Sequence, residues 1–537
     1  MKWLGGALPL SVFWLAPLLG GLAAVSFTAN DPAAWRAFFS HPQIWHGLAL
    51  SFATGTMGLA LSVAIALWIA AGLHGNMTWN KMQQLVGGFL SLPHLAFAVG
   101  FGFLIMPSGL IARVIALALG WTTPPPWVTT QDPYGFALLA VLVLKEVPFI
   151  LWLIAGHMQR PEFSSLLNEQ ARVARSLGHG DGSIWLRVVL PQILPRLLWP
   201  MVIVWVYGAS VVDMALVTGP TQPPPLAVII WGDLNNAQQA LNARGAAGAV
   251  FLTLMLVTAG LAFASAWRLF APLLDVFFTQ GPSGAGAPRR FAFALLVGFR
   301  SLYVAVFLLL FLLSLTGFWA FPALLPPQMQ FSAWSELIES PAPLLNSLSL
   351  AFMSVAVALT FAIVWFETVD ERFDIAVLAF SLAALTLPAI LIAQGQYFLF
   401  LHLMLNGSWF GVLLGHLTPV FAYVFIVLQG PYRAFDPRYR SVSYGLNTDA
   451  LRFWAAIKVP LLKPPLLTAA AVGIGVSIAQ YIPSQLIGSG RVSTLTTEAV
   501  TLASGGNRAL LAAFSLVLMA IPLLAFTLAT RFARNTP

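Results

Sequence analysis

The residues most able to do chemistry are ionisable side chains that interrupt long apolar stretches. Lys145 and Glu146 are adjacent, shortly before Pro148, and Asp213 lies in a later apolar stretch. An ionisable group inside a membrane is costly and is therefore a functional candidate. One interpretation is that Lys145 pairs with Glu146 or Asp213, which would neutralise charge and fix helix packing. The other is that these groups line a polar path for a solute, and both interpretations stay open at this point.

Polar residues later in the chain could belong to the same path. In the later part of the chain, the apolar stretch that corresponds to the one with Asp213 carries uncharged polar side chains between Gln480 and Gln485. Gln394 lies in an earlier apolar stretch. An acidic group together with aromatic rings would suit a cationic solute through charge and cation–π contacts. The predicted path residues are Asp213, Gln394, Gln480, Tyr481, Ser484 and Gln485, and His94, Gln396, Tyr397, His416 and Tyr423 could line the same route.

The sequence lacks the patterns that catalysis or cofactor binding would need. A phosphate-binding P-loop requires a lysine directly after a glycine, and none of the five lysines follows one: Lys2, Lys81, Lys145, Lys458 and Lys463. The chain has no cysteine, and its loops show no metal-spaced histidines, paired carboxylates or nucleophile triad. We therefore expect no enzyme, no metal site and no bound cofactor, so that any ATP is used by a partner subunit.

The elements that must position these residues are membrane-spanning helices. The chain has 537 residues, of which 59% are hydrophobic and 8% charged, with mean hydropathy +0.85; soluble domains carry about 25% charged residues. A spanning helix needs about 20 apolar residues, which predicts an all-α polytopic membrane protein with about 12 spans. The expected spans are Leu8–Phe27, Ile44–Leu73, Leu85–Met106, Tyr134–Ala155, Leu197–Val217, Ala246–Trp267, Ser301–Phe318, Leu344–Phe366, Ile375–Leu399, Phe410–Leu428, Leu466–Ile487 and Ala509–Ala529.

The spans divide into two series of six. A stretch of Gly, Pro, Ser and Ala at 281–288 is typical of a flexible linker. We predict a first half over residues 1–275, a cytoplasmic linker over 276–298 and a second half over 299–537.

The positive charges predict the orientation in the membrane. The net charge is +8, but the basic residues are spread over loops, which does not indicate nucleic-acid binding. Short cytoplasmic loops retain Lys and Arg, and this favours both termini inside. Of the 26 Lys and Arg residues, Lys145 falls within a span and the predicted outer loops hold only Arg36, Arg113, Arg244, Arg491 and Arg508.

An internal repeat relates the two halves. One set of matched residues is separated by 269 positions: Leu177 and Leu446, Trp185 and Trp454, Pro191 and Pro460, Pro195 and Pro464, and Gly219 and Gly488. In the third spans, Pro93 and Pro388, Gly100 and Gly395, and Phe103 and Phe398 are separated by 295 positions, since the first half has a longer outer loop afterwards. An even number of spans per half makes this a parallel repeat.

The loops after the fourth spans carry a family resemblance. Residues 172–178 followed by residues 188–191 resemble the EAA loop of permease subunits of bacterial ABC importers, in which Glu-Ala-Ala and a Gly precede Ile, one residue and Leu-Pro. Ala174, Gly178, Leu190 and Pro191 fit, Val188 replaces Ile, and Arg172 and Val173 depart from the pattern. The second copy is more eroded, with Ser441-Val442-Ser443, Asn447, Ile457, Val459 and Pro460 at the matching places.

The resemblance implies a type I ABC importer permease with two parallel six-helix halves in one chain, in a bacterial inner membrane. It implies two copies of a cytoplasmic ABC ATPase, one on each loop, and a periplasmic solute-binding protein. The fused two-half form of this chain is also similar to permeases for thiamine and for ferric iron. The implied ATPase-coupling residues are Ala174, Leu177, Gly178, Trp185, Val188, Leu190, Pro191, Leu446, Asn447, Trp454, Ile457, Val459 and Pro460.

Each loop should contain a short helix. Asp181 or Ser183 could cap the first, and Asn447, Thr448 or Asp449 the second, because their side-chain oxygens accept from free N–H groups. Pro191 and Pro460 should then end these helices. Trp185 and Trp454 would either anchor at the membrane interface or enter a groove on a cytoplasmic partner.

The main alternative is a secondary transporter of the major facilitator type, which also has about a dozen spans in parallel halves. Its usual basic, glycine-rich loop after the second span is missing, since residues 74–81 hold one lysine and residues 367–374 are mainly acidic. A structural membrane scaffold has no positive support.

Overall fold

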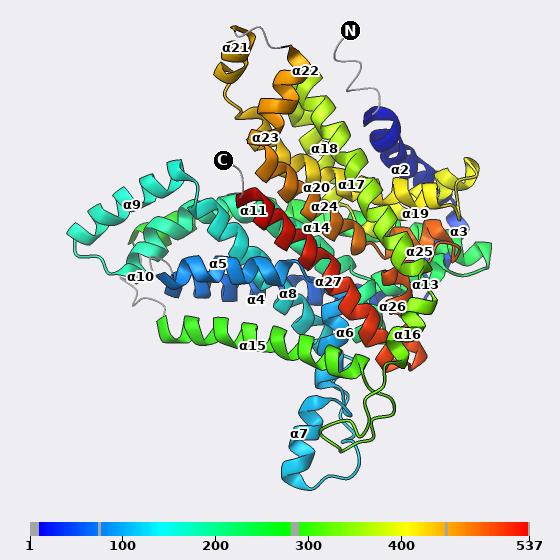
Figure 1. Cartoon of the computed structure of the whole chain (residues 1–537). Coiled ribbons are helices and arrows are strands. Elements are labelled where there is room, and N and C mark those ends of the chain that lie inside the picture. The colour runs from blue at the N-terminus through cyan, green and yellow to red at the C-terminus, as the bar shows by residue number, and fades with distance from the viewer. Residues whose placement is uncertain (1–9, 74–76, 281–288, 446–448, 535–537) are drawn as a thin grey trace.

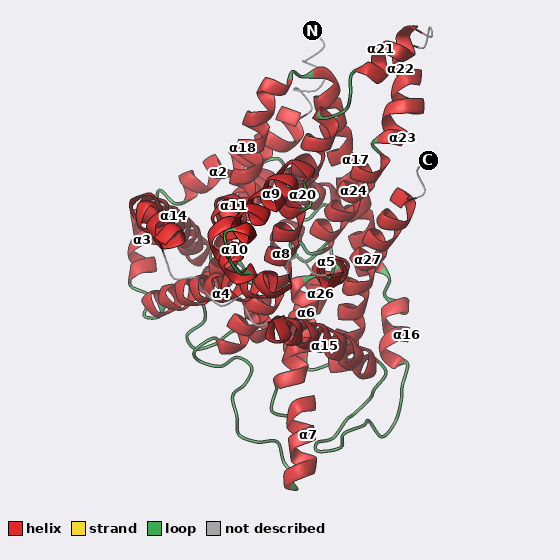
Figure 2. Ribbon diagram, turned by 90° about the vertical axis from the view of Figure 1, so that its left-hand side faces the viewer, coloured by secondary structure: helices red, strands yellow, loops and turns green. Residues whose placement is uncertain are grey.

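The computed structural model describes residues 10–73, 77–280, 289–445 and 449–534. Helices joined by loops make up the described residues, with one isolated bridge between Thr316 and Met329 and no strand among them (Figure 2). The chain is therefore an all-α polytopic membrane protein, as predicted.

The elements before the predicted linker run from η1 to α14. They are η1 (Ser11–Leu15), α2 (Ala16–Thr28), α3 (Pro32–Phe39), α4 (Ile44–Leu73), α5 (Met77–Leu90), α6 (His94–Ile105), α7 (Leu110–Leu119), α8 (Phe136–Met158), α9 (Pro161–Ser176), α10 (Asp181–Ile184), η2 (Trp185–Val189), α11 (Leu190–Ser210), α12 (Asp213–Thr218), α13 (Leu226–Leu234) and α14 (Gln239–Gln280).

The elements after the linker run from α15 to α27. They are α15 (Arg289–Ser314), α16 (Ser332–Glu339), α17 (Ala342–Thr368), η3 (Glu371–Phe373), α18 (Asp374–Thr386), α19 (Ala389–His402), α20 (Trp409–Arg433), α21 (Arg438–Gly445), α22 (Ala450–Phe453), η4 (Trp454–Lys458), α23 (Val459–Leu461), α24 (Lys463–Ile478), α25 (Ile482–Gly488), α26 (Leu495–Gly505) and α27 (Arg508–Arg534).

Fewer continuous spans occur than the sequence suggests. Within the described residues nine helices are long and apolar enough to cross a membrane, or up to eleven if each of two bent helix pairs counts as one span. The first predicted span, Leu8–Phe27, corresponds to a shorter apolar helix over Val12–Ser26. The second, Ile44–Leu73, has the predicted bounds.

The third span of each half is interrupted, which corrects the prediction of continuous helices over Leu85–Met106 and Ile375–Leu399. Pro93 directly precedes α6 and Pro388 directly precedes α19, and both have extended backbones. Proline lacks an N–H and disfavours helix at the residue before it. The second of these breaks turns the chain by 103°.

The fifth spans are interrupted as well, so the predicted helices over Leu197–Val217 and Leu466–Ile487 are also wrong as continuous elements. α11 ends at Ser210 before α12 begins at Asp213, and α24 ends at Ile478 before α25 begins at Ile482. The starts of α12 and α25 are again 269 positions apart. The repeat thus extends to helix breaks.

The predicted linker is shorter than 276–298. α14 continues to Gln280 and α15 already begins at Arg289, while residues 281–288 lie outside the described residues. The division into halves at this linker stays a prediction.

α2 and α15, the first helices of the two predicted halves, each pack against the other predicted half. α2 packs along α19, while α15 packs against α4 and α6 as well as α27. These crossings involve the matched glycines: a Cβ at Gly395 would meet the backbone of Gly21, and a Cβ at Gly100 would meet the side chains of Val306 and Leu310. The exchange ties the two halves together.

Figure 1 gives the overall arrangement. α9 and α10 project from one side of the helical body, α21 and α22 project from its top, and α7 projects from the end opposite to α21 and α22 (Figure 1). The two loops that resemble each other are therefore both distant from α7.

Candidate functional site

A left-handed glycine ends the helix before the first coupling loop. Gly178 has φ +85°, its N–H donates to the Arg175 carbonyl at 3.0 Å, and the N–H of His179 donates to the Ala174 carbonyl at 3.0 Å. Glycine adopts this backbone conformation without steric cost, and such caps commonly end helices. The glycine of the motif therefore acts as a helix stop.

Matched π-helical turns follow in both loops. η2 spans Trp185–Val189 and η4 spans Trp454–Lys458, again 269 positions apart. π-helices account for well under about 1% of residues and often occur at functional sites. A matched pair in two loops of the same chain supports a shared role for these segments.

The two prolines of the motif behave differently. Pro191 lies in the first turn of α11, so it does not end its helix as predicted; the first turn tolerates the missing N–H, and the preceding π turn starts a new hydrogen-bond register. Pro460 lies one residue before the end of α23, after which the chain bends by 72° into α24.

The predicted helix caps are half right. Asp449 caps α22 by accepting from the N–H of Arg452 at 2.6 Å. In the first loop, Gly180 is the N-cap residue, whereas Asp181 pairs with Arg175 at 3.2 Å and Ser183 contacts His179, so neither caps α10. Leu446, Asn447 and Thr448 lie outside the described residues.

The two loop tryptophans are not surface anchors of the same kind. Trp185 is 6% exposed and belongs to an apolar cluster with Ile154, Phe163 and Val189, which fits neither predicted role. Trp454 is half-buried, and its Nε1 donates to the Tyr432 hydroxyl at 3.4 Å.

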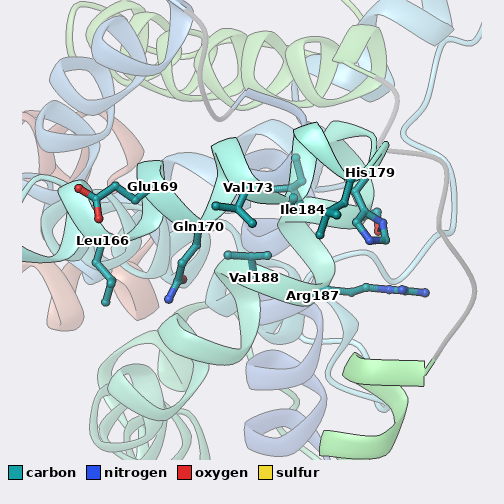
Figure 3. Close-up of a pocket in the computed structure, with 11 residues that line it drawn as sticks. Leu166, Glu169, Gln170, Val173, His179, Ile184, Arg187 and Val188 are labelled. Atoms are coloured by element: carbon teal, nitrogen blue, oxygen red, sulfur yellow. Dashed lines mark hydrogen bonds between the residues drawn. The ribbon is translucent and has the colours of Figure 1, made fainter.

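An apolar groove of about 390 Å³ lies between α9 and η2. Figure 3 shows Val173 of α9 and Val188 of η2 facing each other across it. Val173 is 60% exposed and Leu177 72% exposed, so apolar side chains are presented to the surroundings. The predicted residues Ala174, Leu177 and Val188 line the groove together with Leu166, Glu169, Gln170, Val173, His179, Ser183, Ile184 and Arg187.

The second loop also presents apolar side chains. Val442 of α21 is 64% exposed and lies 269 positions after Val173. The predicted residue Ile457 is half-buried in η4, and Val459 half-buried and Pro460 exposed begin α23. These two exposed valines were not singled out from the sequence, although their shared offset is a signal that the repeat contains.

Lys145 does not form the predicted neutralising pair. Its Nζ donates to the carbonyls of Phe89 at 3.1 Å and Leu92 at 2.7 Å, which lie just before the break at Pro93. Glu146 is paired instead with His94, whose Nε2 lies 3.3 Å from the Glu146 Oε1. The ammonium group thus stabilises the end of α5 and leaves the carboxylates to other partners.

Asp213 lies where the two halves meet. It occupies the first turn of α12, is half-buried, and has no ion pair within 4 Å in the described part of the chain. His94, Tyr207 and Tyr481 are all within electrostatic range of Asp213. The His94 and Tyr207 rings are 5.1 Å apart.

A further tyrosine extends this cluster. Tyr423 of α20 is within electrostatic range of Glu146 and of Tyr207. Acidic groups of the first half therefore face phenol rings of the second. We call His94, Glu146, Tyr207, Asp213, Tyr423 and Tyr481 the central cluster.

The other predicted path residues have mostly structural contacts. His416 bridges Ser477 at 2.9 Å and Ser484 at 2.8 Å, and so joins the ends of α24 and α25. The Gln480 carbonyl accepts from Ser484 at 2.6 Å, and the Gln480 side chain donates to the Val476 carbonyl of α24 at 3.2 Å. Gln394 is buried with no hydrogen-bond partner among the residues that the structure describes, and Gln485 is half-buried.

An all-helical body with interrupted spans, polar groups at the breaks and two matched loops defines a membrane permease. The chain belongs to the inner membrane ABC transporter permeases: it is 31% identical over 522 residues to the inner membrane ABC transporter permease protein YnjC of Escherichia coli strain K12, across 97% of this chain and 94% of that protein. No family model matches the chain.

Membership of this family establishes the general role. The chain is a multi-pass inner-membrane component of a transporter, and such a permease works with an ATPase and a binding protein. The major facilitator alternative is not favoured.

Proposed function

We propose that this chain supplies both halves of the permease of an ATP-driven importer. It translocates a small cationic solute that a periplasmic binding protein delivers, and each of its two loops docks one copy of a cytoplasmic ATPase. Both termini are cytoplasmic in this arrangement. The observation that carries the proposal is the matched pair of π turns, at Trp185–Val189 and Trp454–Lys458, within loops of the same chain.

The groove beside the first loop supports an ATPase contact. Interfaces gain most from apolar anchors in desolvated pockets, and the groove offers apolar walls with Arg187 and Glu169 among its lining residues. An apolar side chain of the ATPase would bind there. At the second loop, Val442 would contact the ATPase in the way that Val173 does at the first loop.

The central cluster supports a cationic solute. Asp213 and Glu146 are carboxylates, and the Lys145 ammonium, which could have neutralised them, is bonded to backbone carbonyls. Tyrosine rings favour organic cations through cation–π contacts, while phenol and carboxylate oxygens are hard ligands that suit ferric iron. Thiamine-like cations and ferric iron are therefore the two solutes to test.

The helix breaks suggest how docking is converted to transport. ATP-driven closure of the two ATPase subunits would bring the two loops together, and the segments behind them would follow as rigid helices. The break before α12 lies between the first loop and Asp213 along the chain, and the break before α25 lies between the second loop and α25 and contains Tyr481. They would allow the path to change from inward-open to outward-open.

Reconstitution in proteoliposomes tests the proposal. The permease, its ATPase and its binding protein should import radiolabelled thiamine or iron-55 into the vesicles. This import should occur only when ATP is present in the vesicle lumen, on the same side of the membrane as the ATPase. Permease alone, with a proton or sodium gradient, should import neither. Import driven by an ion gradient without the ATPase would contradict the proposed function, and ATP-driven import of an anion alone would contradict the solute class.

A further inference from the structure

The second coupling segment is joined to the membrane helices by a polar junction. Lys458, the last residue of η4, donates from its Nζ to the Glu367 Oε1 at 2.7 Å. Glu367 lies one residue before the end of α17. The same carboxylate oxygen accepts from the Tyr432 hydroxyl at 2.6 Å. One acceptor therefore connects η4, α17 and α20.

Tyr432 makes a second connection to η4. Its hydroxyl accepts from Trp454 Nε1 at 3.4 Å, and its ring lies 4.4 Å from Lys458 Nζ. Trp454 and Lys458 are the first and last residues of the π turn, so the turn is held at both ends. Tyr432 itself is only 4% exposed.

The ends of α17 and α20 are themselves fixed. Arg433 donates to both carboxylate oxygens of Asp374 at 2.8 Å, and also to the carbonyls of Phe366 and Val369 at 3.0 Å. A bidentate pair with two further hydrogen bonds is a rigid arrangement. Displacement of η4 is therefore transmitted to α17 through Glu367 rather than absorbed by a loose helix end.

The first coupling segment is held in another way. Val189 takes the place of Lys458 in the repeat, and it is 1% exposed within the apolar cluster around Trp185. No carboxylate is needed there. The first loop is joined to its half by apolar packing and the second by charge.

We propose that Glu367 and Lys458 are positioning residues that transmit movement of the second coupling segment to α17, so that coupling at the second loop depends on an ion pair while coupling at the first does not. This inference rests on the proposed function. The side chains are 34% and 14% exposed, whereas fully solvated pairs contribute little.

The test uses the full chain with its ATPase and binding protein in proteoliposomes, and measures solute imported per ATP hydrolysed. Glu367→Gln and Lys458→Met should each lower this ratio about fivefold, the effect of losing roughly one kcal/mol of coupling. The charge-swapped double variant, Glu367→Lys with Lys458→Glu, should recover at least half of the loss. Asp370→Asn is the matched control, because its pair with Arg372 is 3.8 Å long and 60–75% exposed, and it should leave the ratio unchanged.

Two outcomes would overturn the inference. One is an unchanged import ratio in both single variants. The other is a charge-swapped double variant whose import per ATP hydrolysed is no higher than that of the single variants. This second outcome overturns the inference even if the single variants fail to assemble. A wild-type complex that shows no ATP-driven import would instead count against the proposed function itself, so the two failures are distinguishable.

Discussion

Asp213 is the residue on which the solute class depends most. It is half-buried at the first turn of α12, close to His94 and Tyr481, and no ion pair within 4 Å neutralises it among the described residues. An uncompensated charge at this depth is costly unless it serves the passage of an opposite charge.

We predict that Asp213→Asn lowers import of the cationic solute about tenfold or more, since roughly 1.4 kcal/mol of lost attraction corresponds to a factor of ten. Amounts of assembled permease–ATPase complex should stay at the wild-type level. Import assays and co-purification measure the two quantities. Glu336→Gln, which removes an exposed carboxylate of α16, is the control; an Asp213→Asn variant that imports as fast as this control would refute the assignment.

For individual residues, the sequence indicated which side chains were unusual but did not predict which partners they contact. Asp213 and Tyr481 could be singled out because polar groups are rare in apolar stretches. The expected Lys145 pair with Glu146 fails because neighbouring residues on a helix do not face each other. Lys145 reaches the carbonyls of Phe89 and Leu92, and Glu146 reaches His94, 52 positions away. Such partners depend on which helices pack together.

Among the elements, α9 and α21 present exposed apolar side chains that a partner can reach. Val173 and Val442 are 60% and 64% exposed at matching places on α9 and α21. Trp185 is unsuitable as a probe because it is buried.

We predict that a single cysteine at either Val173 or Val442 crosslinks to the ATPase in the assembled complex. The chain has no native cysteine, so each variant carries one thiol. A cysteine at Leu117, which is 74% exposed on α7, should give no crosslink to the ATPase. Short bifunctional reagents and denaturing gels would detect the products. Absence of crosslinks at both valines and their neighbours, with a complex that still assembles, would exclude these surfaces as docking sites.

The repeat in the sequence located these loops, and the structure explains some of its members. Gly178 fits the family motif at the point where α9 ends. Pro93 and Pro388 match each other because each directly precedes a helix that follows a break. The π turns could not be anticipated, since no residue type specifies an i→i+5 hydrogen-bond register. Interruptions of the fifth spans were hidden for a similar reason: neither break, at 211–212 or at 479–481, contains a proline or a glycine.

For the whole molecule, the exchanged first helices decide how the halves hold together. α2 crosses α19 at Gly395, where the neighbour is the backbone of Gly21, and α15 crosses α6 at Gly100, where the neighbours are the side chains of Val306 and Leu310. Side chains can rotate away from an added methyl group, but a helix backbone cannot.

Gly395→Ala should therefore destabilise the protein by about 1–3 kcal/mol, the usual range for overpacking, and Gly100→Ala should cost less. Gly430→Ala is the control, because a Cβ at this position of α20 meets nothing within 4 Å, and it should leave the melting temperature unchanged or raise it. Thermal unfolding of the purified protein in detergent measures all three. Equal melting temperatures for the variants at Gly395 and Gly430 would contradict a close crossing.

Composition and hydropathy were enough to predict an all-α polytopic protein, and internal offsets were enough to predict a parallel repeat. Which helix packs on which was beyond reach, because lipid-facing and helix-facing surfaces are both apolar and carry few distinguishing residues. The exchange of α2 and α15 is the clearest case.

That exchange sets an order for biosynthesis. Trp14 donates to the carbonyl of Thr418, a residue 404 positions later, so the segment with Trp14 is synthesised long before the helix that accepts its hydrogen bond. Until α20 has been synthesised, Trp14 lacks this partner. Premature chain termination before Thr418 should accordingly leave fragments in which the segment around Trp14 is not packed against α20 and is accessible to quality-control proteases.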